Sequence, residues 1–302
     1  MITTHPPKVY TATLTPLHKD LTVDYLMLTN HITWLLNAGS DGIALLGTTG
    51  EANSFDLKER KGMIEAVLKG GIDPSRLMVG TGSCAYTEAI KLTRFALKSD
   101  IKEILLLPPF YYKQVNEQGL MDFFSRVIEG VADDEMKVIL YHFPKMSGIN
   151  MTNAFVGKLI DKYPRQVVGM KDSSGDLEHM TSICEDFPGF RLFAGTEKFL
   201  LPVLRAGGAG CISATANVTI KMAARVLENW KQEKAHDYQE ALTRVRSIFD
   251  GHPFSAVLKQ YLAQETGNKN WLYMRPPNST LPLDTLQNLN RALIDLSFDM
   301  NE

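Results

Sequence analysis

A single lysine interrupts an apolar, strand-like segment near the middle of the chain. Residues 166–176 have the sequence QVVGMKDSSGD, in which Lys171 follows a hydrophobic run and precedes a polar, turn-forming tail. Burial disfavours the charged ammonium and favours the neutral amine, which can attack a carbonyl carbon and form an iminium. The simpler interpretation is a lysine whose ammonium pairs with a carboxylate. Asp172, the next residue, should point to the opposite side of the strand and is not an assured partner.

Two further sets of polar residues could cooperate with such an amine. Tyr141 lies in an earlier strand-like segment, and its phenol could carry protons while a Schiff base forms and breaks down. In the strip GTTGE (47–51), the hydroxyls of Thr48 and Thr49 and a glycine-opened backbone could hold a small carboxylate. Taken singly, these residues are ordinary packing and turn residues. Together with Lys171 they predict an enzyme that handles a 2-oxo acid through a Schiff base.

These residues need a framework that brings distant segments together. Short apolar segments alternate with longer amphipathic ones up to residue 232, in eight strand–helix units. Such alternation predicts a parallel sheet, and eight units favour a closed (β/α)8 barrel over a doubly wound sheet. The expected strands are 8–17, 41–47, 76–82, 103–109, 137–144, 167–174, 190–196 and 210–217. The expected helices are 24–39, 56–71, 86–100, 116–131, 152–164, 176–188, 198–208 and 221–232.

The barrel interpretation also explains where the polar residues lie. Catalytic groups of such barrels gather at the carboxyl ends of the strands, where Lys171, Tyr141 and Thr48 are expected. After residue 232 the alternation stops, and helical patterns follow at 236–250, 254–265 and 283–297. We therefore expect a barrel domain over residues 1–232 and a helical extension over residues 233–302 that packs on it.

Composition excludes several other classes of function. The formal net charge is -2 and the pI is about 6.4, so nothing favours binding to nucleic acid or to an anionic membrane. The N-terminal sequence MITTHPPKVY has no signal-peptide pattern, and no apolar stretch is long enough to span a membrane. Three cysteines without CxxC spacing argue against disulfides or a zinc site and favour a cytoplasmic protein. The histidines show no metal-binding spacing, and no metal is expected.

Five spaced motifs together resemble the pyruvate-dependent class I aldolases, typified by dihydrodipicolinate synthase and N-acetylneuraminate lyase. The resemblance covers essentially the whole barrel, with the motifs in the same order. The motifs are GTTGE (47–51), PPFYY (108–112), YHFPKMSG (141–148), VGMKDSSGD (168–176) and the segment 195–218.

The resemblance implies a role for each matching residue. Lys171 would form the Schiff base with pyruvate, and Tyr141 would be the acid and base. Thr48 and Thr49 would hold the carboxylate, and Thr48 would also take part in a proton relay. Tyr112 would complete that relay from a neighbouring subunit.

The resemblance also extends to the pocket and the assembly. Gly195 and Ile212 match positions that line the pocket. The family implies a homodimer or a homotetramer that acts on a 2-oxo acid and a second carbonyl substrate, with no metal and no organic cofactor.

One departure leaves the second substrate open. The synthases resemble YNVPSRTG after the tyrosine, whereas this chain has YHFPKMSG and places Met146 where their substrate-binding arginine stands. A thioether cannot bind a carboxylate as an arginine does, although Lys145 is one residue away. Condensation of pyruvate with aspartate semialdehyde and aldol cleavage or dehydration of a 2-oxo-3-deoxy sugar acid both remain open. A non-catalytic barrel that binds a 2-oxo acid is the alternative from another class.

Overall fold

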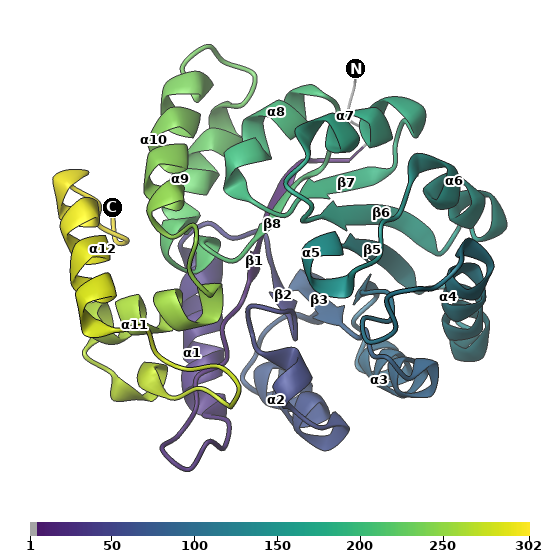
Figure 1. Ribbon diagram of the computed structural model, residues 1–302, viewed down its shortest axis with the longest axis horizontal. Helices are drawn as coiled ribbons and strands as arrows, with labels where there is room; N and C mark the ends of the chain where they lie inside the picture. Colours follow the sequence, from purple (N-terminus) through teal and green to yellow (C-terminus); the bar gives the residue numbers. More distant parts are fainter. Residues whose placement is uncertain (1–4) are drawn as a thin grey trace.

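A closed barrel of eight parallel strands forms the centre of the molecule (Figure 1). The structure is a computed structural model that describes residues 5–302. Each strand pairs with its neighbours in chain order, and β8 pairs with β1 to close the ring. The strands are β1 (Lys8–Ala12), β2 (Gly42–Leu45), β3 (Leu77–Gly80), β4 (Glu103–Leu106), β5 (Lys137–His142), β6 (Val167–Asp172), β7 (Arg191–Ala194) and β8 (Gly210–Ser213). The barrel predicted from the sequence is confirmed.

The sequence predicts no signal peptide at the N-terminus. Residues 1–4 of that segment lie outside the described residues. None of the helices within residues 5–302 has the length together with the apolar composition that a bilayer crossing requires.

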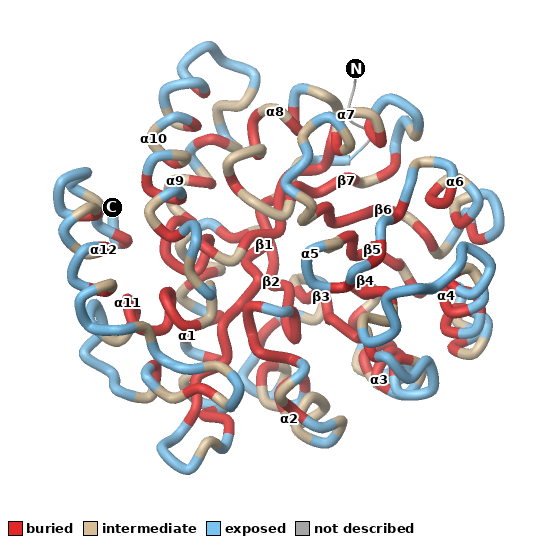
Figure 2. Tube along the Cα trace, in the orientation of Figure 1, coloured by how far each residue is buried: buried red, intermediate tan, exposed pale blue. Residues whose placement is uncertain are grey.

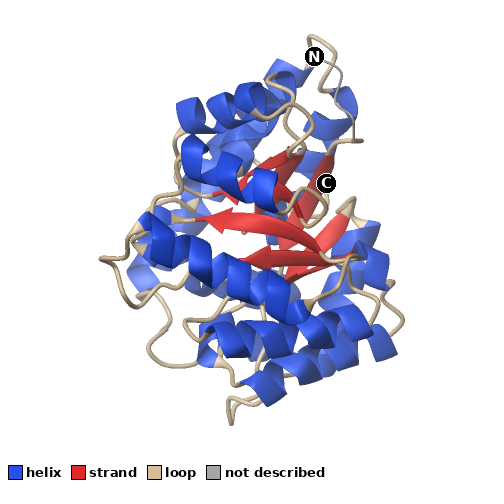
Figure 3. Ribbon diagram, turned by 90° about the vertical axis from the view of Figure 1, so that its right-hand side faces the viewer, coloured by secondary structure: helices blue, strands red, loops and turns tan. Residues whose placement is uncertain are grey.

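Helices surround the strands on the outside of the barrel (Figure 3). Asp24, Asp56, Asn116, Thr152 and Asp176 each accept a hydrogen bond from the backbone of the helix that follows, which explains why those helices begin there. The barrel helices are α1 (Tyr25–Asn37), α2 (Leu57–Lys69), α3 (Tyr86–Lys98), α4 (Glu117–Val131), α6 (Asn153–Lys162), α7 (Leu177–Asp186), α8 (Leu200–Arg205) and α9 (Ala216–Asn229). Short elements occupy several loops: η1 (Ala52–Ser54), η2 (Pro74–Arg76), α5 (Pro144–Ser147) and η3 (Glu197–Phe199).

Apolar side chains cover both faces of the strands, and the buried part of the chain follows the barrel wall (Figure 2). Ile43, Leu45 and Val79 belong to the larger core, which includes buried residues of the surrounding helices. Tyr10 and Ile212 belong to a smaller cluster that comes mainly from the alternate positions of the strands. A charged group on the inner face is therefore conspicuous, because most of its neighbours there are apolar.

The chain continues beyond the barrel as three helices on one side of it, coloured green to yellow in Figure 1. They are α10 (Ala235–Ile248), α11 (Phe254–Thr266) and α12 (Leu283–Asp295), with η4 (Lys269–Leu272) between the last two. Helix α10 packs against α9 and η3, and α11 packs against α9, η4 and α12. Their own core includes Val245, Phe249, Leu258 and Trp271. These contacts bring the last part of the chain beside the loops that follow β1, β7 and β8.

The predicted strand 210–217 is too long. Strand β8 ends at Ser213, and α9 begins at Ala216 instead of near residue 221. The side chain of Asn217 donates to the carbonyl oxygens of Ala12 and Ala214 at 2.8 and 2.7 Å, which holds the start of α9 against the end of β1. Such a side-chain bond between the neighbouring ends of β8 and β1 is invisible in a hydrophobic pattern.

Candidate active site

The amine of Lys171 and the phenol of Tyr141 lie together on the inner face of the barrel. Register pairing sets Lys171 on β6 directly beside Tyr141 on β5, and both point to the same face. The Lys171 Nζ atom donates to the Tyr141 hydroxyl at 3.4 Å and lies 4.4 Å from the centroid of its ring. Each residue is only 5% exposed. Within residues 5–302, no carboxylate forms an ion pair with this amine.

Thr48 joins this pair from a third strand. It follows β2, and its Oγ1 atom lies 3.5 Å from the Tyr141 hydroxyl. Thr48 is exposed, whereas Thr49 is buried. A compact turn fixes both residues, since the Glu51 amide donates to the Thr48 carbonyl at 3.1 Å. The hydroxyls of Tyr141 and Thr48 thus form a path that leads from the buried amine of Lys171 toward solvent.

Gly195 and Ile212 lie on the neighbouring strand ends. Ile212 is fully buried in β8 and belongs to the inner cluster that also contains Tyr141. Gly195 follows β7, and its amide donates to the Asp172 carbonyl at 2.6 Å. A Cβ atom at Gly195 would lie 2.7 Å from that carbonyl oxygen and would collide with Oγ of Ser173. The loop after β7 can therefore approach β6 this closely only with glycine at this position.

The aromatic neighbour of Tyr141 was not predicted. The Phe143 ring stacks on the Tyr141 ring with centroids 5.7 Å apart and planes at 26°. Phe143 leads directly into the short helix α5, in which Lys145 is exposed and Met146 is 56% exposed. The stacking places this loop against the catalytic candidate Tyr141.

Tyr112 does not join the buried group within this chain. It is 71% exposed, and its ring meets that of Tyr111 edge to face at 5.2 Å. In the described part of the chain, no hydrogen bond connects Tyr112 with Tyr141 or Thr48.

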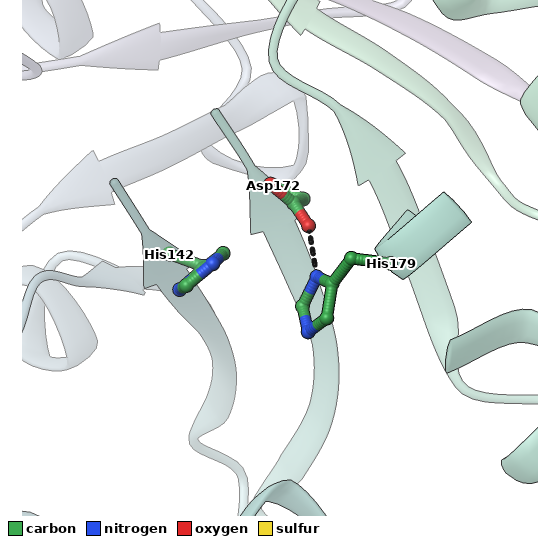
Figure 4. Close-up of side chains that lie close together, drawn as sticks. All are labelled: His142, Asp172 and His179. Carbon is green, nitrogen blue, oxygen red and sulfur yellow. Dashed lines mark hydrogen bonds and ion pairs between the residues drawn. The ribbon is translucent and has the colours of Figure 1, made fainter. Parts of the chain in front are cut away.

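A second polar cluster lies on the opposite, outer face of the same strands (Figure 4). His142 of β5, Asp172 of β6 and His179 of α7 point toward one another, and the His179 Nδ1 atom lies 2.6 Å from Oδ2 of Asp172. Asp172 therefore points away from Lys171, as the strand alternation predicts. The bond ties the first turn of α7 to the end of β6.

Electrostatics supports an ion pair between Asp172 and His179. Their hydrogen bond raises the pKa of His179 above its ordinary value. Burial acts to raise the pKa of Asp172, but the hydrogen bonds from His179 and Ser174 outweigh it and keep that pKa low. Burial lowers the pKa of His142, which favours its neutral form.

The same three residues have a composition that divalent metals accept, and their candidate ligand atoms all lie within 4.8 Å of one another. Sequence spacing gave no sign of this grouping, because the three residues come from three different elements. A hydrogen bond already pairs the carboxylate with one of the two imidazoles.

Comparison with known proteins assigns the family. Residues 5–295 match the model of the dihydrodipicolinate synthetase family. An uncharacterized DapA-like lyase of Chloroflexus aurantiacus is 33% identical over 246 residues, which are 81% of each chain. The 4-hydroxy-tetrahydrodipicolinate synthase of Oceanobacillus iheyensis is 30% identical over 295 residues, covering 95% of this chain and 96% of that protein. The dihydrodipicolinate synthase structure from Agrobacterium tumefaciens superposes with a TM-score of 0.89 at 26% identity, covering 96% of this chain and 99% of that one. The chain therefore belongs to the dihydrodipicolinate synthetase family of pyruvate-dependent class I aldolases and lyases.

Proposed function

We propose that the chain makes or breaks a carbon–carbon bond, or removes water, through an iminium between Lys171 and pyruvate or another 2-oxo acid. The observation that carries the proposal is the 3.4 Å contact between Nζ of Lys171 and the hydroxyl of Tyr141 in the barrel interior. An amine without a carboxylate partner is suited to nucleophilic attack, and an adjacent phenol is suited to proton transfer. Membership of a family of class I aldolases supports the same chemistry.

Apart from the 2-oxo acid and the aldehyde, the reaction takes up and releases only water. The neutral amine of Lys171 adds to the keto carbon, and the phenol of Tyr141 gives a proton to the hydroxyl that leaves as water. The Tyr141 phenolate takes a proton from C3 and converts the iminium to an enamine; C3 of the enamine attacks an aldehyde while the Tyr141 phenol returns that proton to the aldehyde oxygen. Water then hydrolyses the new iminium and releases the product and the free amine. Cleavage runs in reverse, and dehydration expels a C4 hydroxyl as water from the enamine.

The hydroxyls of Thr48 and Thr49 are proposed to hold the carboxylate of the 2-oxo acid, and Gly195 and Ile212 to line its pocket. Thr48 also extends the proton path from Tyr141, as supported by the 3.5 Å between their oxygen atoms. Positioning the carboxylate fixes the keto carbon relative to the amine, which lowers the entropic part of the barrier.

Trapping with borohydride tests this proposal. Incubation with pyruvate and borohydride should add one reduced pyruvyl group at Lys171, located by peptide mass spectrometry. Lys171→Met should abolish the adduct. Lys137→Met is the matched control, because Lys137 begins β5 at the opposite end of the barrel and donates to the Arg165 carbonyl. Saturable binding of pyruvate without any adduct would instead identify a non-catalytic 2-oxo-acid-binding barrel.

The second substrate separates two candidate reactions. Relatives named 4-hydroxy-tetrahydrodipicolinate synthase support condensation with aspartate semialdehyde. The exposed Met146 in α5 supports a substrate without a carboxylate at that position, such as a 2-oxo-3-deoxy sugar acid that is cleaved or dehydrated. A coupled assay with pyruvate and aspartate semialdehyde, run beside a panel of 2-oxo-3-deoxy acids, distinguishes the two.

We further propose that the protein works in the cytoplasm as a homodimer or homotetramer in which Tyr112 reaches the site of a second copy. Its 71% exposure and the absence of a bond to Thr48 or Tyr141 within residues 5–302 of one chain support such a role. Light scattering of the purified protein measures the assembly. Tyr112→Phe should slow turnover without changing the mass of the assembly, and an active monomer would contradict the role of Tyr112.

A further inference from the structure

The turn that carries Thr48 and Thr49 ends in a carboxylate that is turned away from solvent. Glu51 closes the strip GTTGE, is only 4% exposed, and has a left-handed backbone with φ of 58°. A residue with a side chain adopts this conformation at some cost, and it persists where the surroundings determine the backbone strongly. The hydroxyl of Thr15, in the loop after β1, also donates to the Gly50 carbonyl at 2.7 Å and supports the turn.

The partners of Glu51 come from the last part of the chain. Lys259 of α11 is completely buried, and its Nζ atom donates to Oε1 of Glu51 at 2.8 Å and to the Tyr273 carbonyl at 2.7 Å. The other carboxylate oxygen accepts from the Arg275 amide and the Asn278 side chain, both at 3.2 Å. In Figure 1 the segment after α11 accordingly extends toward the loop between β2 and α2.

A similar arrangement holds the loop after β7. Glu197, two residues beyond Gly195, is completely buried and accepts from the hydroxyl of Thr219 at 2.7 Å and from those of Ser213 and Thr215. Arg246 of α10 lies 3.4 Å from its carboxylate, at ion-pair distance. The barrel extension thus supplies one buried cation to each of two loops at the mouth of the barrel.

A stabilising role alone is a poor explanation for these pairs. Two buried charges lose their hydration, and an apolar pair of similar volume often stabilises a fold equally well. Burial lowers the pKa of Lys259, in agreement with that cost. An apolar pair cannot fix the orientation of its side chains through hydrogen bonds. The Lys259 ammonium does so for Glu51, because it donates a hydrogen bond to its carboxylate.

We propose that Lys259 is a positioning residue for the 2-oxo-acid site: through Glu51 it fixes the turn that presents Thr48 and Thr49 to the substrate carboxylate. This inference rests on the proposed function of that site. The C-terminal helices therefore set the affinity for the 2-oxo acid although they contribute no group that touches it.

Exchange of the methyl protons of pyruvate with D2O, followed by NMR, needs no second substrate and tests the inference. Lys259→Met should raise the half-saturating pyruvate concentration by about tenfold, equivalent to a typical coupling energy, with a maximal rate within about twofold of the parent. Lys269→Met is the matched control, because it makes the same change at an exposed position of the extension. It should leave both values unchanged.

Two further variants separate positioning from stability. Glu51→Gln combined with Lys259→Met leaves no unpaired buried charge and should recover most of the melting temperature lost in the single variant, while the half-saturating concentration stays high. Asn278→Ala removes one neutral donor from a half-buried position and should raise that concentration in the same direction by about two- to threefold. This milder variant decides the matter if Lys259→Met does not fold.

The possible failures are distinguishable. If the parent protein gives no borohydride adduct with pyruvate, the proposed function is wrong, and this inference with it. If the parent is trapped at Lys171 but the Lys259 and Asn278 variants keep the parental half-saturating concentration, only the positioning role is wrong. Recovery of both melting temperature and half-saturation in the double variant would likewise reduce the pair to a structural role.

Discussion

Lys171 and Asp172 are consecutive residues of β6, and their side chains leave the barrel wall on opposite sides. The amine meets the Tyr141 hydroxyl inside at 3.4 Å, and the carboxylate meets His179 outside at 2.6 Å. The strand alternation that separates them keeps the nearest acid away from the amine. The same strand therefore holds the proposed nucleophile on one face and, on the other, an ion pair that anchors a helix.

Replacing the phenol at position 141 should slow chemistry and preserve the fold. Tyr141→Phe removes the hydroxyl that lies between the Lys171 amine and Thr48 but keeps the ring that packs against Phe143. The maximal rate of pyruvate proton exchange should fall by about 10²-fold or more, the usual contribution of a positioned acid or base. Circular dichroism should be unchanged. A rate within a few-fold of the parent would exclude Tyr141 as the proton carrier.

The outer ion pair should make stability depend on pH. The pKa of His179 is raised by its bond to Asp172, so its contribution is complete below the unfolded value of about 6.5 and is lost as pH rises through the folded pKa. The low pKa of Asp172 gives a contribution that is present above about pH 4 and lost on further acidification. Burial lowers the pKa of His142, so the folded protein resists protonation of this residue. This destabilises the fold only below about pH 6.5, and increasingly as the pH falls.

Above neutrality the effect of His179 can therefore be isolated. The melting temperature of the parent should decline between about pH 6.5 and pH 8.5 as the ion pair loses its proton, and His179→Gln should remove most of that decline. Scanning calorimetry at several pH values measures both. Parallel curves for the two proteins would show that the pair carries no pH-dependent stability.

A methyl group at position 195 should disturb the contact between the loops after β6 and β7. The new Cβ atom of Gly195→Ala would lie 2.7 Å from the Asp172 carbonyl oxygen and would collide with Ser173. We expect a loss of about 1–3 kcal/mol in the free energy of unfolding, as for other overpacked sites, together with weaker pyruvate binding. Urea titration and proton exchange measure the two effects.

Gly119→Ala is the control for this variant. Gly119 lies within α4, where a Cβ atom meets only the end of the Asn116 side chain. Alanine there should be neutral or stabilising, because it favours the helix. Equal losses at positions 119 and 195 would attribute the effect to glycine replacement in general.

Adding an arginine at position 146 should change the choice of second substrate. Met146 is 56% exposed in α5, so Met146→Arg adds a bidentate carboxylate binder without burying a charge. The kcat/KM with pyruvate and aspartate semialdehyde should rise by about tenfold or more, which corresponds to one charge-assisted hydrogen bond. Met146→Gln, of similar length and uncharged, should not produce this gain. An equal response of both variants would remove Met146 as a determinant of specificity.

The alternation of apolar segments was enough to predict the barrel, because each strand is buried and each helix has one apolar face. It also placed Lys171, Tyr141 and Thr48 at one end of the barrel, since parallel strands present their carboxyl ends together. The cluster of His142, Asp172 and His179 could not be predicted, because it is assembled by packing between β5, β6 and α7. Sequence separation likewise hides contacts such as Asn217 with Ala12, which shortened the predicted eighth strand.

The pairing of Glu51 with Lys259 joins residues that are 208 positions apart in the chain. A ribosome adds about 5–20 residues per second, so Glu51 emerges roughly 10–40 s before its cation. During that interval the turn after β2 lacks the hydrogen bonds that fix it, although its strand has already been made. If Lys259 positions the turn as proposed, the protein can first bind its 2-oxo acid only after the C-terminal helices have been made, and a chain that ends before them would have a barrel in which this turn is not fixed.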